Sequence, residues 1–209
     1  MIKYKTVMKA AEIEQIIERS RFIGYVKPVE SREEAEEFIT EIRAKHKEAT
    51  HNVPAFVIGD KFQLQWASDD GEPQGTSGAP IVQMLVKEGI TNIAIVITRY
   101  FGGIKLGTGG LVRAYTGTAK LALEAAGVCA VKELDVLTVK LDYSFHGKLQ
   151  NLASKGNFYI ASTTFEDKVT LELVMEPEHT QEVRTLISNL TGGSGTIVSE
   201  GKKLAKVLI

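Results

Sequence analysis

The residues best suited to chemistry lie in a glycine-rich segment between an apolar run and an amphipathic one. In ITRYFGGIKLGTGGLVRAY, residues 97–115, five glycines fall within nine residues, and basic side chains flank them. Glycine destabilises regular structure by roughly 0.5–1 kcal/mol relative to alanine, so this density indicates a position that needs bare backbone. The candidate residues for binding an anion or a nucleic acid are Arg99, Tyr100, Phe101, Gly102, Gly103, Lys105, Gly107, Thr108, Gly109, Gly110 and Arg113.

A strand, a glycine turn and a helix start together form an anion site, because unpaired N–H groups and the helix dipole favour negative charge there. The known phosphate motifs are nevertheless incomplete. Thr108 stands where a P-loop requires lysine, and Val112 stands where the dinucleotide motif requires its third glycine. Two alternatives stay open: a tight turn needed only for packing, and a contact with phosphates in which Tyr100 or Phe101 stacks on a base.

An acidic segment, SDDGEP at 68–73, forms the second candidate site. Asp69, Asp70 and Glu72 could hold a divalent cation or act in acid–base chemistry, with His51 as a base. The alternating ligands of an EF-hand are absent, however, and acidic turns commonly cap the next helix. The sequence therefore favours a capping role, and we expect no metal and no cofactor.

Nucleophile patterns are incomplete as well. GTSGA around Ser77 ends in Ala79 where a nucleophile elbow requires glycine. The single cysteine, Cys129, lies among apolar residues and is expected to be a buried, unreactive thiol. With no complete triad or metal shell, the sequence favours an interaction surface, and hence a non-enzymatic protein.

Composition limits the partners. The 209 residues carry a net charge of −1, so bulk charge excludes a basic nucleic-acid binder and any such contact must use a local patch. No run approaches the roughly 18 apolar residues that span a bilayer, and the N-terminus lacks a secretory signal. A lone cysteine excludes an internal disulfide. We expect a cytoplasmic protein with no membrane partner.

Hydrophobic periodicity predicts an α+β fold with two domains, residues 1–134 and 135–209. Ser31 and Glu34 form a capping-box pattern at the start of a helix. The first domain is expected to contain strands at 12–17, 21–29, 51–59, 61–67 and 92–101, and helices at 31–46, 80–89 and 110–127. The second is expected to contain strands at 135–143, 158–167, 168–177 and 196–209, and helices at 145–156 and 178–193. This β-α-β-β-α-β order predicts a ferredoxin-like domain.

Several separated motifs, in order, resemble the IMPACT family. They are SRFI at 20–23, ATHN at 49–52, SDDGEP at 68–73, GTSG at 75–78, RYFGG at 99–103 and LGTGGLVRAY at 106–115. The likeness covers roughly residues 1–130, and bacterial members carry a second, ferredoxin-like domain. Val53 stands where many relatives have cysteine, which weakens any thiol role at that position.

The resemblance implies a first domain similar to domain 2 of ribosomal protein S5 and to domain IV of elongation factor G. It implies a tail similar to domain V of that factor. The RWD module of eukaryotic members is not expected here, so their partner contacts are not carried over.

Together these observations favour a cytoplasmic factor that binds RNA or the ribosome, regulates translation, for example under stress, and contacts translation-related proteins. An enzyme acting on a small phosphorylated or nucleotide ligand is the alternative, and a protein-interaction module is a third.

Overall fold

The structure is a computed structural model that describes residues 2–209. The chain divides into two compact units. The N-terminal unit comprises residues 3–131 and 206–209, and the C-terminal unit comprises residues 132–205 with Ile2. The boundary expected from the sequence, after residue 134, lies three residues beyond the observed one. The sequence pattern did not indicate that the last four residues return to the first unit, because such a return depends on contacts distant in sequence.

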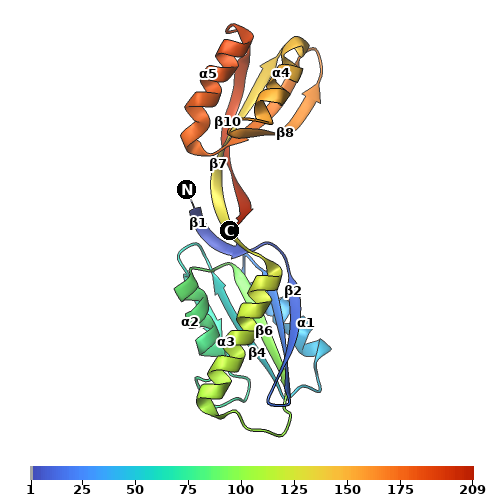
Figure 1. Cartoon of the computed structure of the whole chain (residues 1–209), viewed down its shortest axis with the longest axis vertical. Coiled ribbons are helices and arrows are strands. Elements are labelled where there is room, and N and C mark those ends of the chain that lie inside the picture. The colour runs from blue at the N-terminus through green and yellow to red at the C-terminus, as the bar shows by residue number, and fades with distance from the viewer. Residues whose placement is uncertain (1) are drawn as a thin grey trace. The chain divides into compact units, whose positions relative to one another are not determined.

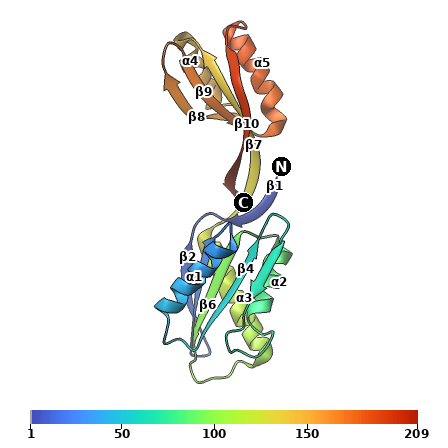
Figure 2. The same cartoon turned by 180° about the vertical axis from the view of Figure 1, so that it is seen from behind.

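A five-stranded sheet forms the centre of the N-terminal unit, with the order β2-β3-β6-β4-β5 and antiparallel neighbours throughout. Helix α1 covers one face of this sheet, and α2 and α3 cover the other (Figures 1 and 2). The elements are β1 (Ile2–Val7), β2 (Ala11–Ile17), β3 (Ser20–Pro28), α1 (Arg32–Lys45), β4 (His51–Ile58), β5 (Leu64–Ala67), α2 (Gly78–Glu88), β6 (Ile93–Tyr100) and α3 (Gly107–Ala126).

Strand β6 is apolar from Ile93 to Ile97, as expected for a strand with both faces of the sheet covered. Ile93, Ile95 and Ile97 pack toward α2 and α3, while Ala94 and Val96 pack toward α1. Successive side chains of a strand point to opposite faces. The last two residues of the strand, Arg99 and Tyr100, therefore point to different sides of the sheet, which separates two residues that the sequence analysis grouped together.

Helix α1 begins as predicted, with one difference at its cap. The Ser31 hydroxyl accepts a hydrogen bond from the Glu34 N–H at 3.2 Å, but the Glu34 carboxylate accepts from the Glu30 N–H at 2.9 Å instead of from Ser31. Ala35, Phe38, Ile39 and Ile42 form the buried stripe that the periodicity predicted. Burial of each large side chain contributes about 1.5–3 kcal/mol.

The C-terminal unit has the predicted β-α-β-β-α-β order. Strand β10 pairs with β7, β7 with β9, and β9 with β8, and the helices bury Leu137, Val139 and Leu141 of β7. The elements are β7 (Val128–Leu141), α4 (Tyr143–Ala153), β8 (Phe158–Phe165), β9 (Val169–Met175), η1 (Pro177–His179), α5 (Thr180–Thr191) and β10 (Thr196–Leu208).

Several expected boundaries were wrong. Strand β7 begins at Val128 instead of 135, and β1 was not predicted at all, because both depend on pairing with each other across the sequence. At the far end of β7, the strand stops at Leu141 and Tyr143 begins α4. Helix α3 begins at Gly107, three residues earlier than expected, so most of the glycine segment forms its first turn.

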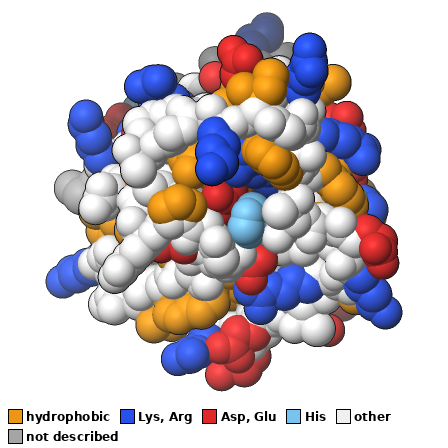
Figure 3. All heavy atoms as spheres, turned by 90° about the horizontal axis from the view of Figure 1, so that it is seen from below, with side chains coloured by type: hydrophobic (Ala, Val, Ile, Leu, Met, Phe, Trp, Pro, Cys, Tyr) orange, Lys and Arg blue, Asp and Glu red, His pale blue; other side chains and the backbone are white. Residues whose placement is uncertain are grey.

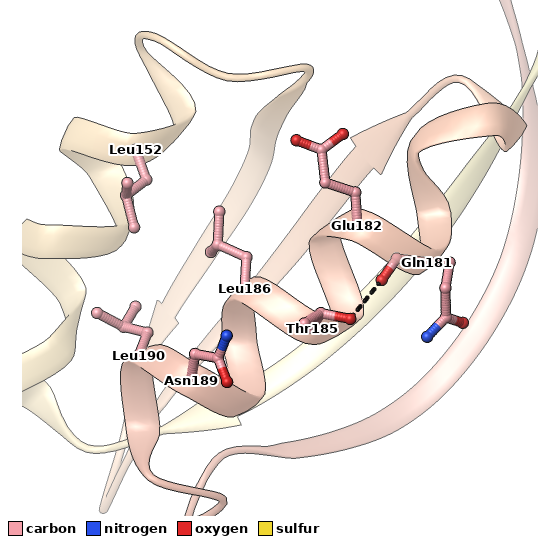
Figure 4. Close-up of a pocket in the computed structure, with 7 residues that line it drawn as sticks. All are labelled: Leu152, Gln181, Glu182, Thr185, Leu186, Asn189 and Leu190. Carbon is pink, nitrogen blue, oxygen red and sulfur yellow. Dashed lines mark hydrogen bonds between the residues drawn. The ribbon is translucent and has the colours of Figure 1, made fainter.

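A pocket of about 680 Å³ opens between α4 and α5 of the C-terminal unit. Leu152, Leu186 and Leu190 point into it, and Glu182 lies at its rim (Figure 4). Its lining includes a carboxylate and no lysine or arginine, so it does not suit a phosphate group.

Candidate functional site

Helix α3 begins with an uncapped, exposed first turn at the end of the N-terminal unit. Leu106 occupies the N-cap position and provides no side-chain hydrogen bond, and the first turn contains no acidic residue. Gly107, Thr108 and Gly109 are all exposed. The first N–H groups of a helix lack partners within the helix, and the dipole adds positive charge there. This turn can therefore bind an anion through its backbone.

Three glycines before and at this turn are required by the fold. A Cβ on Gly102 would lie 2.0 Å from the Arg19 carbonyl oxygen, so the loop packs directly against the turn between β2 and β3. Gly103 and Gly107 have φ values of +87° and +70°, which L side chains adopt only with strain. The expected role in tight packing is therefore part of the explanation.

Gly109 has no such requirement. A Cβ there would meet only the flexible end of Arg113, whose Nη1 would be 3.5 Å away. At the neighbouring Gly110 a Cβ would press against the Leu106 side chain at 3.0 Å. The fold thus does not require a glycine at position 109, in the first turn of α3. Bare backbone at this point fits the close approach of a ligand.

Three exposed cations surround the start of α3. Lys105 and Arg113 were candidates from the sequence, and Arg19, at the tip of the β2–β3 turn, was missed. None of the three has a hydrogen-bond or ion-pair partner among residues 2–209. The close approach of Gly102 to the Arg19 carbonyl and the hydrogen bond from the Gly102 N–H to Ser20 Oγ place this turn beside the glycine loop, residues 101–106. We call Arg19, Phe101, Lys105, 107–110 and Arg113 the glycine-loop face.

Arg99 lies inside the unit, not on this face. Only 4% of the residue is exposed, and its Nη1 donates to Glu72 Oε1 at 2.7 Å. The Tyr115 hydroxyl donates to the same oxygen at 2.6 Å. Burial, followed by this hydrogen bond, raises the pKa of Tyr115 well above its ordinary value, which keeps the phenol a donor. The Arg99 charge is therefore compensated internally and is not available to a phosphate.

Arg99 instead fixes the glycine loop to its neighbours. Its Nη2 donates to Ser20 Oγ at 3.3 Å, and the same hydroxyl accepts from the Gly102 N–H at 3.2 Å. The guanidinium also lies 5.4 Å from the centre of the Phe22 ring and 5.3 Å from that of Phe101. Arg99 is thus a positioning residue for the loop.

His51, the first residue of β4, lies against the acidic segment beside Glu72. Its Nδ1 lies 2.8 Å from the Asp70 carbonyl oxygen. A carbonyl only accepts, so Nδ1 carries the hydrogen. Its Nε2 lies 3.7 Å from Glu72 Oε1. Figure 3 shows the end of the unit that carries these loops, where acidic and basic side chains lie beside a histidine near the centre of the face.

Asp69 and Asp70 serve the local fold. Asp69 Oδ1 accepts from the N–H groups of Ser77 and Gly78 at the start of α2, at 3.1 and 2.9 Å. Burial opposes ionisation of Asp69, but the hydrogen bonds outweigh it and lower the pKa of its carboxyl. Asp70 Oδ2 accepts from the Asn52 N–H at 2.7 Å, and its Oδ1 pairs with Arg43 at 3.1 Å.

The three carboxylates of the acidic segment therefore have separate protein partners and do not converge. Within residues 2–209, no group of three or more His, Cys, Asp or Glu side chains is placed to hold a metal ion. Glu72 connects the acidic segment to the glycine loop through Arg99. The acidic segment thus stabilises the glycine loop through this buried ion pair.

The aromatic candidates differ in exposure. The Tyr100 hydroxyl bonds to His46 Nδ1 at 2.9 Å on the α1 side of the sheet, and Arg21 lies over the Tyr100 ring. Phe101 is 46% exposed and lies on the glycine-loop face, so it is the ring best placed to stack on a base.

Two family models match this chain. The Impact N-terminal domain matches residues 18–123, and a domain of unknown function, DUF1949, matches residues 139–194. The two-unit α+β fold and these matches define the class of protein: the chain belongs to the IMPACT family. In residues 2–209, no helix is both long and apolar enough to cross a membrane.

Known relatives match over most of their length. The chain is 39% identical over 194 residues to IMPACT family member YvyE of Bacillus subtilis, covering 93% of this chain and 89% of that one. It is 33% identical over 180 residues to IMPACT family member YigZ of Escherichia coli, covering 85% and 88%. A solved structure, described as a crystal structure of an hypothetical protein, is 29% identical with a TM-score of 0.59 and covers 100% and 98%.

Proposed function

We propose that this protein is an RNA-binding factor of the translation apparatus, and that the glycine-loop face binds the RNA backbone. The observation that carries this proposal is the open first turn of α3, where Gly109 offers bare backbone that the fold does not require. Phosphate is one of the anions that the first turn of a helix binds through its backbone N–H groups.

The charges around this turn support the same function. Arg19, Lys105 and Arg113 are exposed and unpaired within residues 2–209, so their charge is available to phosphates. The chain as a whole carries −1, which limits binding to this local patch. Phe101 adds a ring for stacking, and stacking is typical of single-stranded partners.

The translational context rests on resemblance. The IMPACT family domain resembles domain 2 of ribosomal protein S5 and domain IV of elongation factor G, and the second unit resembles domain V of that factor. A ribosomal RNA, together with translation-related proteins, is therefore the partner that we propose, and regulation of translation is the outcome. Cosedimentation of the protein with ribosomes provides the cellular test.

Removing two cations of the face tests the proposal directly. Lys105→Ala/Arg113→Ala is expected to weaken binding of a fluorescein-labelled heptauridylate RNA and to reduce the slope of log K against log salt by about 1 to 2. Fluorescence anisotropy between 50 and 200 mM salt measures both quantities.

Lys61→Ala/Lys87→Ala is the matched control, since both lysines are exposed and their side chains are unpaired in residues 2–209. Lys61 follows β4 and Lys87 precedes β6, so the strand register places both at the opposite end of the sheet from the glycine loop. It should retain the wild-type slope. Equal losses in the two double variants, or no binding by the wild type, would exclude the glycine-loop face as the RNA site.

A further inference from the structure

A pocket of about 430 Å³ lies between the β2–β3 turn and the start of α3. Aliphatic side chains form its walls, and charged side chains stand at its edges. The aliphatic residues include Ile17, Ile104 and Leu106, and the charged residues are Glu18, Lys105 and Arg113. Its volume falls in the range of small-ligand sites, so it is large enough for one flat heterocycle.

The pocket shares two cations with the glycine-loop face. Lys105 and Arg113 line the pocket and also flank the uncapped helix start. A phosphate bound at the first turn of α3 would therefore place the group attached to it next to the aliphatic walls. In RNA that group is a nucleoside, and single-stranded RNA is recognised through bases that leave the stack.

Glu18 is the residue that a pure phosphate site would not contain. Its carboxylate lines the pocket, is exposed, and has no hydrogen-bond or ion-pair partner within residues 2–209. A carboxylate repels phosphate and acts only as an acceptor. What it can bind is an edge that offers N–H donors, as carboxylates do with the amino group of cytosine.

We propose that this pocket binds one unstacked guanine of an RNA strand. Guanine has two adjacent donors on its Watson–Crick edge, N1–H and the N2 amino group, which match the two oxygens of the Glu18 carboxylate. Uracil offers a single donor there. The proposal rests on RNA binding at the glycine-loop face and adds base selection to it.

The experiment compares heptamers that differ in one base. Wild-type protein is expected to bind UUUGUUU at least about fivefold more tightly than UUUUUUU, since a good paired contact discriminates by at least that factor. Adenine and cytosine at the central position should fall between these two. Glu18→Gln should abolish the preference for guanine while retaining affinity for UUUUUUU.

Two further variants separate folding from recognition. Glu18→Asn tolerates the left-handed backbone at this position, where φ is +45°, and should lose the preference as well. Glu37→Gln, an exposed carboxylate on α1, should retain it. Binding of all four heptamers with equal affinity, or a preference that survives Glu18→Gln, overturns the guanine pocket and leaves RNA binding standing. Absence of binding to every heptamer overturns both.

Discussion

Glu72→Gln is expected to lower the free energy of unfolding of the N-terminal unit by about 3–5 kcal/mol, as loss of one partner from a buried ion pair does. Glutamine has nearly the same shape, so little packing is lost. The Arg99 cation would remain buried without a counter-charge, and the Tyr115 hydroxyl would compete with it for one amide oxygen. Both groups are at least 95% buried.

Urea unfolding followed by tryptophan fluorescence measures this loss, because the single tryptophan, Trp66, lies in the N-terminal unit. Glu37→Gln should remain within about 0.5 kcal/mol of wild type, as surface substitutions usually do. Combining Glu72→Leu with Arg99→Met should cost less than the sum of the two single changes, because the unpaired charge disappears with its partner. A Glu72→Gln variant within 1 kcal/mol of wild type would show that the ion pair does not support the loop.

Gly102→Ala is expected to cost about 3 kcal/mol or more, at the upper end of overpacking effects. The added methyl carbon would lie 2.0 Å from the Arg19 carbonyl oxygen and 2.6 Å from the Ser20 nitrogen. Both are backbone atoms, so no side-chain rotation relieves the clash, and the β2–β3 turn must move away from the glycine loop. The same fluorescence-detected unfolding measures the loss.

Gly109→Ala, in the first turn of α3, is the control. Its methyl group has space, and alanine favours a helix over glycine by up to about 1 kcal/mol. It should therefore be as stable as wild type or slightly more stable. If Gly102→Ala unfolded at the same urea concentration as Gly109→Ala, the close approach of the loop to the turn would be refuted.

Local patterns in the sequence predicted most elements of the fold. Three such patterns are the apolar run of β6, the apolar stripe of α1 and the alternation of side chains in β7. Each indicates which side chains of its element are buried, and each depends only on neighbouring residues. Strand β1 and the final residues of β10 were harder to predict, because their place depends on pairing with β7, about eighty residues or more away in the chain.

The site was predicted less well, and Arg99 shows why. An arginine beside five glycines suggests an exposed cation, yet the strand register turns this side chain inward to a carboxylate 27 residues earlier in the chain. The exposed cation that the sequence analysis missed, Arg19, belongs to a turn some eighty residues earlier in the chain. Neither fact follows from local spacing, since both arise from how β3, β4 and β6 are paired.

Comparing Gly109→Ala with Gly117→Ala tests the central claim most directly. Both changes add one methyl group to α3, both sites have room for it, and neither alters a charge. If the first turn of α3 binds phosphate through bare backbone, Gly109→Ala should weaken heptauridylate binding about tenfold, the equivalent of one lost hydrogen bond to a charged group. Gly117→Ala should bind like wild type. Equal affinity of the two variants for the RNA would contradict the account.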